Sequence, residues 1–275
     1  MKTSRIGLTA RIIGVVAVLG IAVFPIYWML VTSLTKDSDL FGNKAHLLPD
    51  FSLIGTYGKA LSGPVPGWLL NSFIIAAGTF LVSVLLAIPL GYALSRFRFP
   101  GKAAVVIGLF VTQMLPEALL VVPLFSLFRR LDLLDSLRGL IIVNAAFVLP
   151  IVAFILKGAF DGLPKELEEA ARVDGCTPVG VLARINLPLI APSIAATSVI
   201  AFFHGWNEYV FAVTFAFDKA IQPASVGLSS LIGELSTPIQ TVMAVALMYT
   251  LPAAGFFLFA QKYVVAGMTA GSVKG

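Results

Sequence analysis

Long apolar stretches alternate with short polar segments along the chain. Five uncharged stretches cover residues 12–35, 60–95, 139–156, 185–207 and 235–261. A further apolar stretch, 103–127, is interrupted only by Glu117. A helix needs about 20 apolar residues to cross a bilayer, and Pro64 and Pro66 indicate that the second stretch enters its helix near Trp68. The pattern predicts six membrane-spanning helices, over residues 12–34, 68–95, 103–127, 139–157, 191–217 and 239–262.

The composition supports an integral membrane protein. Hydrophobic residues make up 58% of the 275 residues and charged residues 12%, whereas soluble domains contain about 25% charged residues. The mean hydropathy of +0.95 agrees with this class. We expect one all-α membrane domain over residues 1–275. Its first apolar stretch is too long for the core of a signal peptide, so we expect it to be retained.

The distribution of Lys and Arg predicts the orientation in the membrane, because cytoplasmic loops carry an excess of these residues. Twelve of the 19 lie in the N-terminal segment, the 96–102 turn, the 157–190 loop, at Lys262 and in the tail, 263–275. Five acidic residues accompany these twelve, whereas the other seven basic residues are balanced by seven acidic ones. We therefore expect both termini and the 157–190 loop in the cytoplasm. The net charge of +5 then reflects topology and does not indicate nucleic-acid binding.

The polar segment 161–190 reads as a helical hairpin between the fourth and fifth expected spans. Pro164 suits a first helical turn, where its missing N–H is not needed, and helix-forming residues follow it. Gly175 provides a C-terminal stop. Thr177 and the proline after it are typical of an N-cap and first residue, which predicts a second short helix over 179–185.

The hairpin contains the pattern Glu-Ala-Ala-x3-Gly-x9-Ile-x-Leu-Pro, which resembles the cytoplasmic coupling loop of membrane-spanning subunits of ATP-binding-cassette (ABC) importers. The matching positions are Glu169, Ala170, Ala171, Gly175, Ile185, Leu187 and Pro188. The resemblance implies that these positions, with Arg172 and Asp174 beside them, couple the chain to a partner ATPase. The alternative is a solvated hairpin without a partner.

Other segments are similar to the smaller permease subunit of carbohydrate-uptake ABC importers of the maltose type. They are the loop from Leu163, the segment Trp206-Asn207-Glu208-Tyr209 and the C-terminal residues 267–275. The resemblance implies a heterodimer with a second permease, two ATPase subunits and an extracytoplasmic solute-binding protein, in a bacterial or archaeal cytoplasmic (inner) membrane. It implies import of a sugar or sugar-like solute by alternating access, without catalysis in this chain. It also implies that the tail contacts the ATPases through Thr269, Ala270, Gly271 and Ser272.

Polar residues at membrane depth are candidates for the substrate pathway. They are Gln113 and Glu117 in the third expected span, and Trp206, Asn207 and Glu208 in the fifth. A carboxylate inside a bilayer is costly, so it should face protein or a wet pathway. An aromatic ring beside polar groups suits the stacking and hydrogen bonding of a sugar. The alternative for both carboxylates is an interhelical brace.

The sequence lacks the residues of several other kinds of site. Its only cysteine, Cys176, excludes an intrachain disulfide, and two histidines do not make a metal cluster. Neither Gly-Lys pair belongs to a phosphate-binding loop. We therefore expect no cofactor or metal in this chain and assign ATP and Mg to partner subunits. The rival function is a proton-coupled secondary transporter that uses Glu117 and Glu208. Co-purification with an ATPase distinguishes the two.

Overall fold

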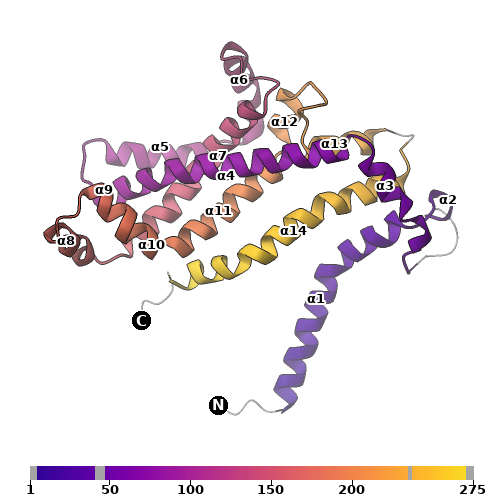
Figure 1. Cartoon of the computed structure of the whole chain (residues 1–275), viewed down its shortest axis with the longest axis horizontal. Helices are drawn as coiled ribbons and strands as arrows, with labels where there is room; N and C mark the ends of the chain where they lie inside the picture. The colour runs from indigo at the N-terminus through magenta and orange to yellow at the C-terminus, as the bar shows by residue number, and fades with distance from the viewer. Residues whose placement is uncertain (1–4, 41–46, 235–236, 271–275) are drawn as a thin grey trace. The chain divides into compact units, whose positions relative to one another are not determined.

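A computed structural model of the chain describes residues 5–40, 47–234 and 237–270 (Figure 1). Within these ranges all regular structure is helical, and no strand is present. The long helices are α1 (Arg5–Ser33), α4 (Val65–Arg96), α7 (Leu137–Asp161) and α14 (Ile239–Ala270). Helices of intermediate length are α5 (Lys102–Met114), α6 (Glu117–Arg130), α11 (Ala191–Trp206) and α13 (Ala224–Gly233). The short elements are α2 (Asp37–Leu40), a 3-10 turn (Phe51–Leu53), α3 (Gly55–Leu61), α8 (Lys165–Val173), α9 (Pro178–Val181), a π-helical turn (Leu182–Asn186), α10 (Leu187–Leu189) and α12 (Val210–Phe215).

The described helices include four to six candidate membrane spans. Four are long and apolar enough on their own: Arg11–Ser33, Val65–Arg96, Leu137–Asp161 and Ile239–Lys262. Two bent pairs raise the number to six if each pair makes one crossing. They are α5 with α6, bent by 106°, and Pro178–Leu189 with α11, bent by 79°. The all-helical membrane fold is thus supported, whereas the arrangement of six spans in one domain stays a prediction.

Two of the expected spans are interrupted in the structure. The stretch 103–127 is divided at Leu115 and Pro116, because Leu115 has extended backbone and Pro116 has no N–H to continue the helix. The stretch 191–217 is divided after Trp206, and α12 begins at Val210. Five further prolines lie inside helices: Pro25, Pro89, Pro123, Pro150 and Pro252.

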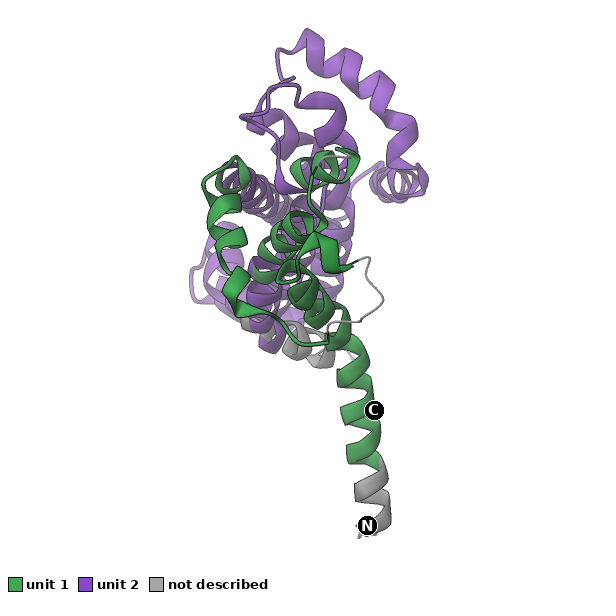
Figure 2. Ribbon diagram, turned by 90° about the vertical axis from the view of Figure 1, so that its right-hand side faces the viewer, with its two compact units in different colours: residues 1–66, 227–251 green, residues 67–226, 252–275 purple. Residues whose placement is uncertain are grey.

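The chain divides into two compact units, each made of two stretches of sequence (Figure 2). Residues 1–66 and 227–251 form the first unit. In it, the Ser33 and Tyr57 hydroxyls are 2.6 Å apart, and the backbone N–H of Gln240 donates to the Asp37 carboxylate. Between residues 11 and 28 of α1 most apolar side chains are exposed, and Ile21 is 76% exposed. Such exposure of a long apolar helix is expected where lipid is the solvent.

Residues 67–226 and 252–275 form the second unit, in which α4, α7 and α11 pack closely. A Cβ added to Gly91 of α4 would lie 3.0 Å from the Lys157 backbone nitrogen and 3.1 Å from the Ala153 carbonyl oxygen of α7. One added to Gly205 of α11 would lie 2.9 Å from the Ala76 Cα of α4. Small residues at these positions allow the three backbones to approach, as is usual between membrane helices.

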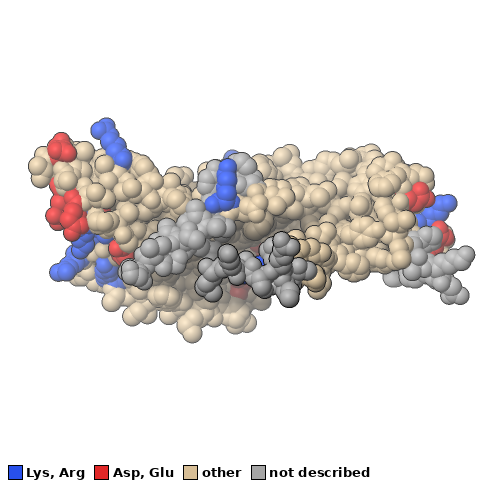
Figure 3. All heavy atoms as spheres, turned by 90° about the horizontal axis from the view of Figure 1, so that it is seen from below, with Lys and Arg blue, Asp and Glu red and all other residues tan. Residues whose placement is uncertain are grey.

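Charged side chains are sparse on the molecular surface. On the face drawn in Figure 3 they form a few separate groups, and most of the surface between them carries no charge. One cluster of acidic and basic side chains lies on α8 and its neighbours, where the coupling hairpin is expected. This hairpin is the candidate site.

Candidate functional site: the hairpin between α7 and α11

The first arm of the hairpin is α8, and its C-terminus is closed by a Schellman motif. Gly175 has the left-handed φ of +85° that this motif requires. Its N–H donates to the Arg172 carbonyl at 3.1 Å, and the Cys176 N–H donates to the Ala171 carbonyl at 2.9 Å. Two carbonyls at the helix end are thus satisfied, and the chain turns sharply into the second arm.

The second arm begins at Thr177, as the sequence predicts, and then departs from a regular α-helix. The Thr177 hydroxyl accepts a hydrogen bond from the Gly180 N–H at 3.1 Å and caps α9. A single helix was expected over 179–185, but the structure has a π-helical turn over Leu182–Asn186, in which the Leu187 N–H bonds to the Leu182 carbonyl. Such turns add one residue to a helical turn and often occur at functional sites. Here the turn ends at Asn186, which is buried.

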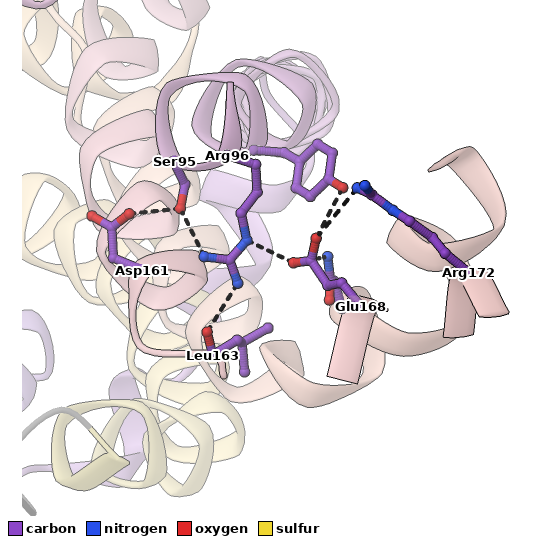
Figure 4. A network of polar contacts seen from close by, with 8 residues as sticks. Ser95, Arg96, Asp161, Leu163, Glu168 and Arg172 are labelled. Carbon is purple, nitrogen blue, oxygen red and sulfur yellow. Dashed lines mark hydrogen bonds and ion pairs between the residues drawn. The ribbon is translucent and has the colours of Figure 1, made fainter. Parts of the chain in front are cut away.

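Glu168 joins the two arms of the hairpin to the end of α4 (Figure 4). Its Oε1 accepts hydrogen bonds from Arg96 Nε at 2.6 Å and from Asn186 Nδ2 at 3.0 Å. Its Oε2 lies 3.4 Å from the Tyr92 hydroxyl, which donates to it, and 4.0 Å from a guanidinium nitrogen of Arg172. The Arg96 and Glu168 side chains are 7% and 6% exposed. A charge pair this buried depends on both partners, and removing one typically costs about 3–5 kcal/mol.

Arg96 also contacts the start of the hairpin. Its second terminal nitrogen donates to the Leu163 carbonyl at 3.0 Å. Beside it, the Ser95 hydroxyl donates to the Asp161 carboxylate at 2.6 Å (Figure 4). The end of α4 therefore binds the end of α7, the entry to the hairpin and its first arm, and Glu168 connects that arm to the second through Asn186. We call Arg96, Glu168 and Asn186 the hairpin clamp.

The residues of the sequence pattern divide between the surface and the interior of the hairpin. Glu169, Ala170, Arg172, Asp174, Gly175 and Pro188 are exposed, and Ile185 and Leu187 are half-buried. Ala171 is only 7% exposed, so it packs inside the hairpin and is not part of an open surface. Two valines at the turn, Val173 and Val179, are 88% and 74% exposed. Exposed apolar side chains at a hairpin tip are suited to contact with another protein.

Sequence reasoning missed the hairpin clamp and the two exposed valines. Glu168 lies three residues before Ala171, so both share the inner face of α8. This spacing is a local signal that Glu168 points inward. Its partner Arg96 is 72 residues away, and that pairing depends on tertiary packing that no local pattern shows.

The candidate pathway residues are brought together only in part. The Gln113 amide donates to the Phe147 carbonyl at 2.9 Å, and Glu117 lies 4.0 Å from the His204 ring. Trp206 is buried, whereas Asn207 is exposed at the end of α11. The Glu208 carboxylate accepts the Phe211 N–H at 2.5 Å and the Ala212 N–H at 2.9 Å, and thus satisfies two backbone donors in the first turn of α12. This geometry favours a structural role for Glu208.

The tail residues lie partly outside the described structure. The backbone of Thr269 and Ala270 ends α14, whereas Gly271 and Ser272 lie outside the described residues. Their expected contact with an ATPase stays a prediction. Within the described residues no group of His, Cys, Asp and Glu could hold a metal ion.

Residues 83–269 match the model of the family described as binding-protein-dependent transport system inner membrane component. The chain belongs to this family. The matched region of this inner membrane component contains the whole hairpin and its clamp. The resemblance to ABC importer permeases is therefore confirmed, and the chain is a transport component rather than an enzyme.

Individual relatives of this inner membrane component cover nearly the whole chain. It is 34% identical to the trehalose/maltose transport system permease protein MalG of Thermococcus litoralis over 96% of each chain. It is 32% identical to the sulfoquinovosyl glycerol transport system permease protein SmoH of Agrobacterium fabrum over 92% of this chain and 89% of that protein. It also matches a chain of a bacterial ABC transporter involved in the import of the acidic polysaccharide alginate. That match has a TM-score of 0.80 and 25% identity, over 96% of this chain and 99% of the other.

Proposed function

We propose that this chain is a membrane-spanning permease subunit of an ATP-driven importer for a sugar or sugar-like solute. The family match over residues 83–269 carries the proposal, because it spans the hairpin and the helices on both sides of it. The relatives support the substrate class. Their names refer to trehalose and maltose, to a glycosyl glycerol and to a polysaccharide, all of which are carbohydrates or glycosides.

The hairpin is the proposed contact with a partner ATPase. Glu169, Arg172 and Asp174 offer charges at its surface, and Val173 and Val179 offer apolar contact area. An interface combines an apolar centre with a polar rim, and this surface has both. ATP binding and hydrolysis, with Mg, belong to two ATPase subunits in this proposal, and the chain itself needs no cofactor.

The proposed importer function also implies the subunits of the assembly and its location in the cell. A second, homologous permease completes the membrane pathway, and an extracytoplasmic solute-binding protein delivers the solute. The chain crosses a bacterial or archaeal inner membrane six times, with both termini and the hairpin in the cytoplasm. The excess of Lys and Arg in these segments supports this orientation. In the fifth span, Glu208 is bound by two backbone N–H groups, which gives less support to a proton-coupled mechanism.

Site-directed cross-linking tests the hairpin contact. Ala170→Cys, in a Cys176→Ser background, is labelled in membranes with a benzophenone maleimide and irradiated, so that the benzophenone inserts into C–H bonds of any protein in contact, and adducts are identified by mass spectrometry. We expect an adduct with an ATP-binding-cassette subunit, because Ala170 is exposed on the outer face of α8. Ser62→Cys, which is exposed in the segment expected outside the cell, serves as the control and should give no such adduct. Absence of the ATPase adduct at Ala170 would contradict the proposal.

A further inference from the structure

The hairpin makes few polar side-chain contacts with the rest of the described chain, and they concentrate at one place. Arg96 Nε and the Glu168 carboxylate are 2.6 Å apart, and the same guanidinium binds the Leu163 carbonyl at 3.0 Å. The Asn186 amide reaches the same carboxylate oxygen from the second arm. A force applied to either arm therefore reaches the end of α4 through the hairpin clamp.

The geometry points to the hairpin clamp as the element that makes the hairpin and α4 move as one body, and it assigns Arg96 and Glu168 as positioning residues for transport. This inference rests on the proposed function, since it concerns how motion of a partner ATPase would reach the membrane helices.

Two features of the clamp favour a mechanical link over a surface contact. The two charged side chains are almost fully buried, so water cannot replace the bonds at little cost when the hairpin is pulled. The guanidinium binds two separate groups with two nitrogens, which fixes the direction of the bond as well as the distance. A single exposed ion pair, such as Lys157 with Asp161, has neither property.

The clamp also connects to a closely packed region. Gly91, five residues before Arg96, lies against the α7 backbone, where no side chain larger than hydrogen fits without displacement. Packed interiors transmit displacement because they have few voids to absorb it. Motion that reaches the end of α4 would therefore be passed to α7 rather than lost in local bending.

Spin-label distances measure this directly. Labels replace Leu85 on α4 and Leu167 on α8, both exposed, in a Cys176→Ser chain within the complete complex in lipid nanodiscs. Distances are measured by double electron–electron resonance without nucleotide and with Mg-ATP and vanadate. With the clamp intact, we expect one narrow distance distribution that does not change with nucleotide.

Substitutions then test the clamp. Glu168→Gln keeps the shape of the side chain and removes its charge, and we expect the distribution to broaden and shift with Mg-ATP and vanadate. Glu166→Gln, at an exposed position of the same helix, is the matched control and should behave as the wild type. Arg96→Gln should reproduce the defect, whereas Arg96→Lys, which keeps the positive charge but cannot reach both acceptors with two fixed nitrogens, should restore the narrow distribution only in part. Rescue by Lys would not follow from a requirement for shape alone.

The outcomes separate the inference from the proposed function. If the ATPases stay bound and Glu168→Gln retains the unchanged distance, or if the wild-type distance itself shifts with nucleotide, the clamp is not the link. The same holds if Arg96→Gln retains the narrow, unchanged distance. If the wild-type complex contains no ATPase, the proposed function is wrong, and the inference fails with it.

Discussion

The Gly175 position allows a graded test of the hairpin geometry. Its φ of +85° is left-handed, and no atom lies within 4 Å of an added Cβ. A substitution there meets open space, so its cost comes from the backbone conformation alone. For an L-residue the left-handed region costs about 1–2 kcal/mol, whereas Asn adopts it more readily. We therefore expect the order Gly, then Asn, then Ala, then Val in increasing disruption of the turn.

The expected cost is enough to disturb function. About 1–2 kcal/mol changes the ratio of correctly turned to open hairpin by a factor of roughly 5–30. The Schellman bonds of Gly175 and Cys176 would be lost in the open form. Gly175→Val should therefore lower ATP hydrolysis by the reconstituted complex by up to about 30-fold, while insertion into the membrane is unchanged.

The assay compares hydrolysis with amide hydrogen exchange over residues 171–177. Gly162→Ala is the matched control, because Gly162 is also at a helix end but has a right-handed φ of −75°. We expect Gly162→Ala to match the wild type and Gly175→Asn to retain most activity. Equal loss with Asn and Val, or near-normal hydrolysis with Val, would contradict the backbone argument.

Three further predictions concern the hairpin surface, the helix packing and the topology. Glu169→Lys should abolish ATPase retention in a pull-down while Glu166→Lys has little effect, because only Glu169 belongs to the proposed contact; similar retention by both variants would remove its role. Gly91→Ala should destabilise the protein by about 1–3 kcal/mol through overpacking against α7, measured as a lower Tm in detergent. Gly108→Ala meets open space and should leave the Tm unchanged. Equal Tm values for the two variants would show that α7 moves aside without cost. Arg172→Cys in a Cys176→Ser background should resist an impermeant thiol reagent in intact cells, and labelling from outside would overturn the orientation.

Local sequence signals predicted the ends of the hairpin helices. Pro164 precedes α8, Gly175 has the left-handed turn and Thr177 caps the second arm. These features depend on residue type at one or two positions, which is why they can be read without the fold. The π-helical turn over Leu182–Asn186 could not be predicted in this way, since no residue in it forces an extra residue into the turn.

Most tertiary contacts could not be predicted from the sequence. The Arg96–Glu168 pair joins residues 72 positions apart, and only the fold brings them together. The sequence left two roles open for Glu208, in the substrate pathway or as an interhelical brace. Its bonds to Phe211 and Ala212 could not be predicted, because they depend on where α11 ends. Apolar length predicted one membrane span over 103–127. The 106° bend at Pro116 shows that local backbone restriction outweighed it.

Native mass spectrometry of the gently solubilised complex tests the central claim most directly. The account predicts an assembly with one copy of this 29.2 kDa chain, one different permease and two ATPase subunits. Its hairpin surface would be occupied by one of those ATPases. A stable, transport-competent particle that contains this chain but no ATPase subunit would contradict the claim.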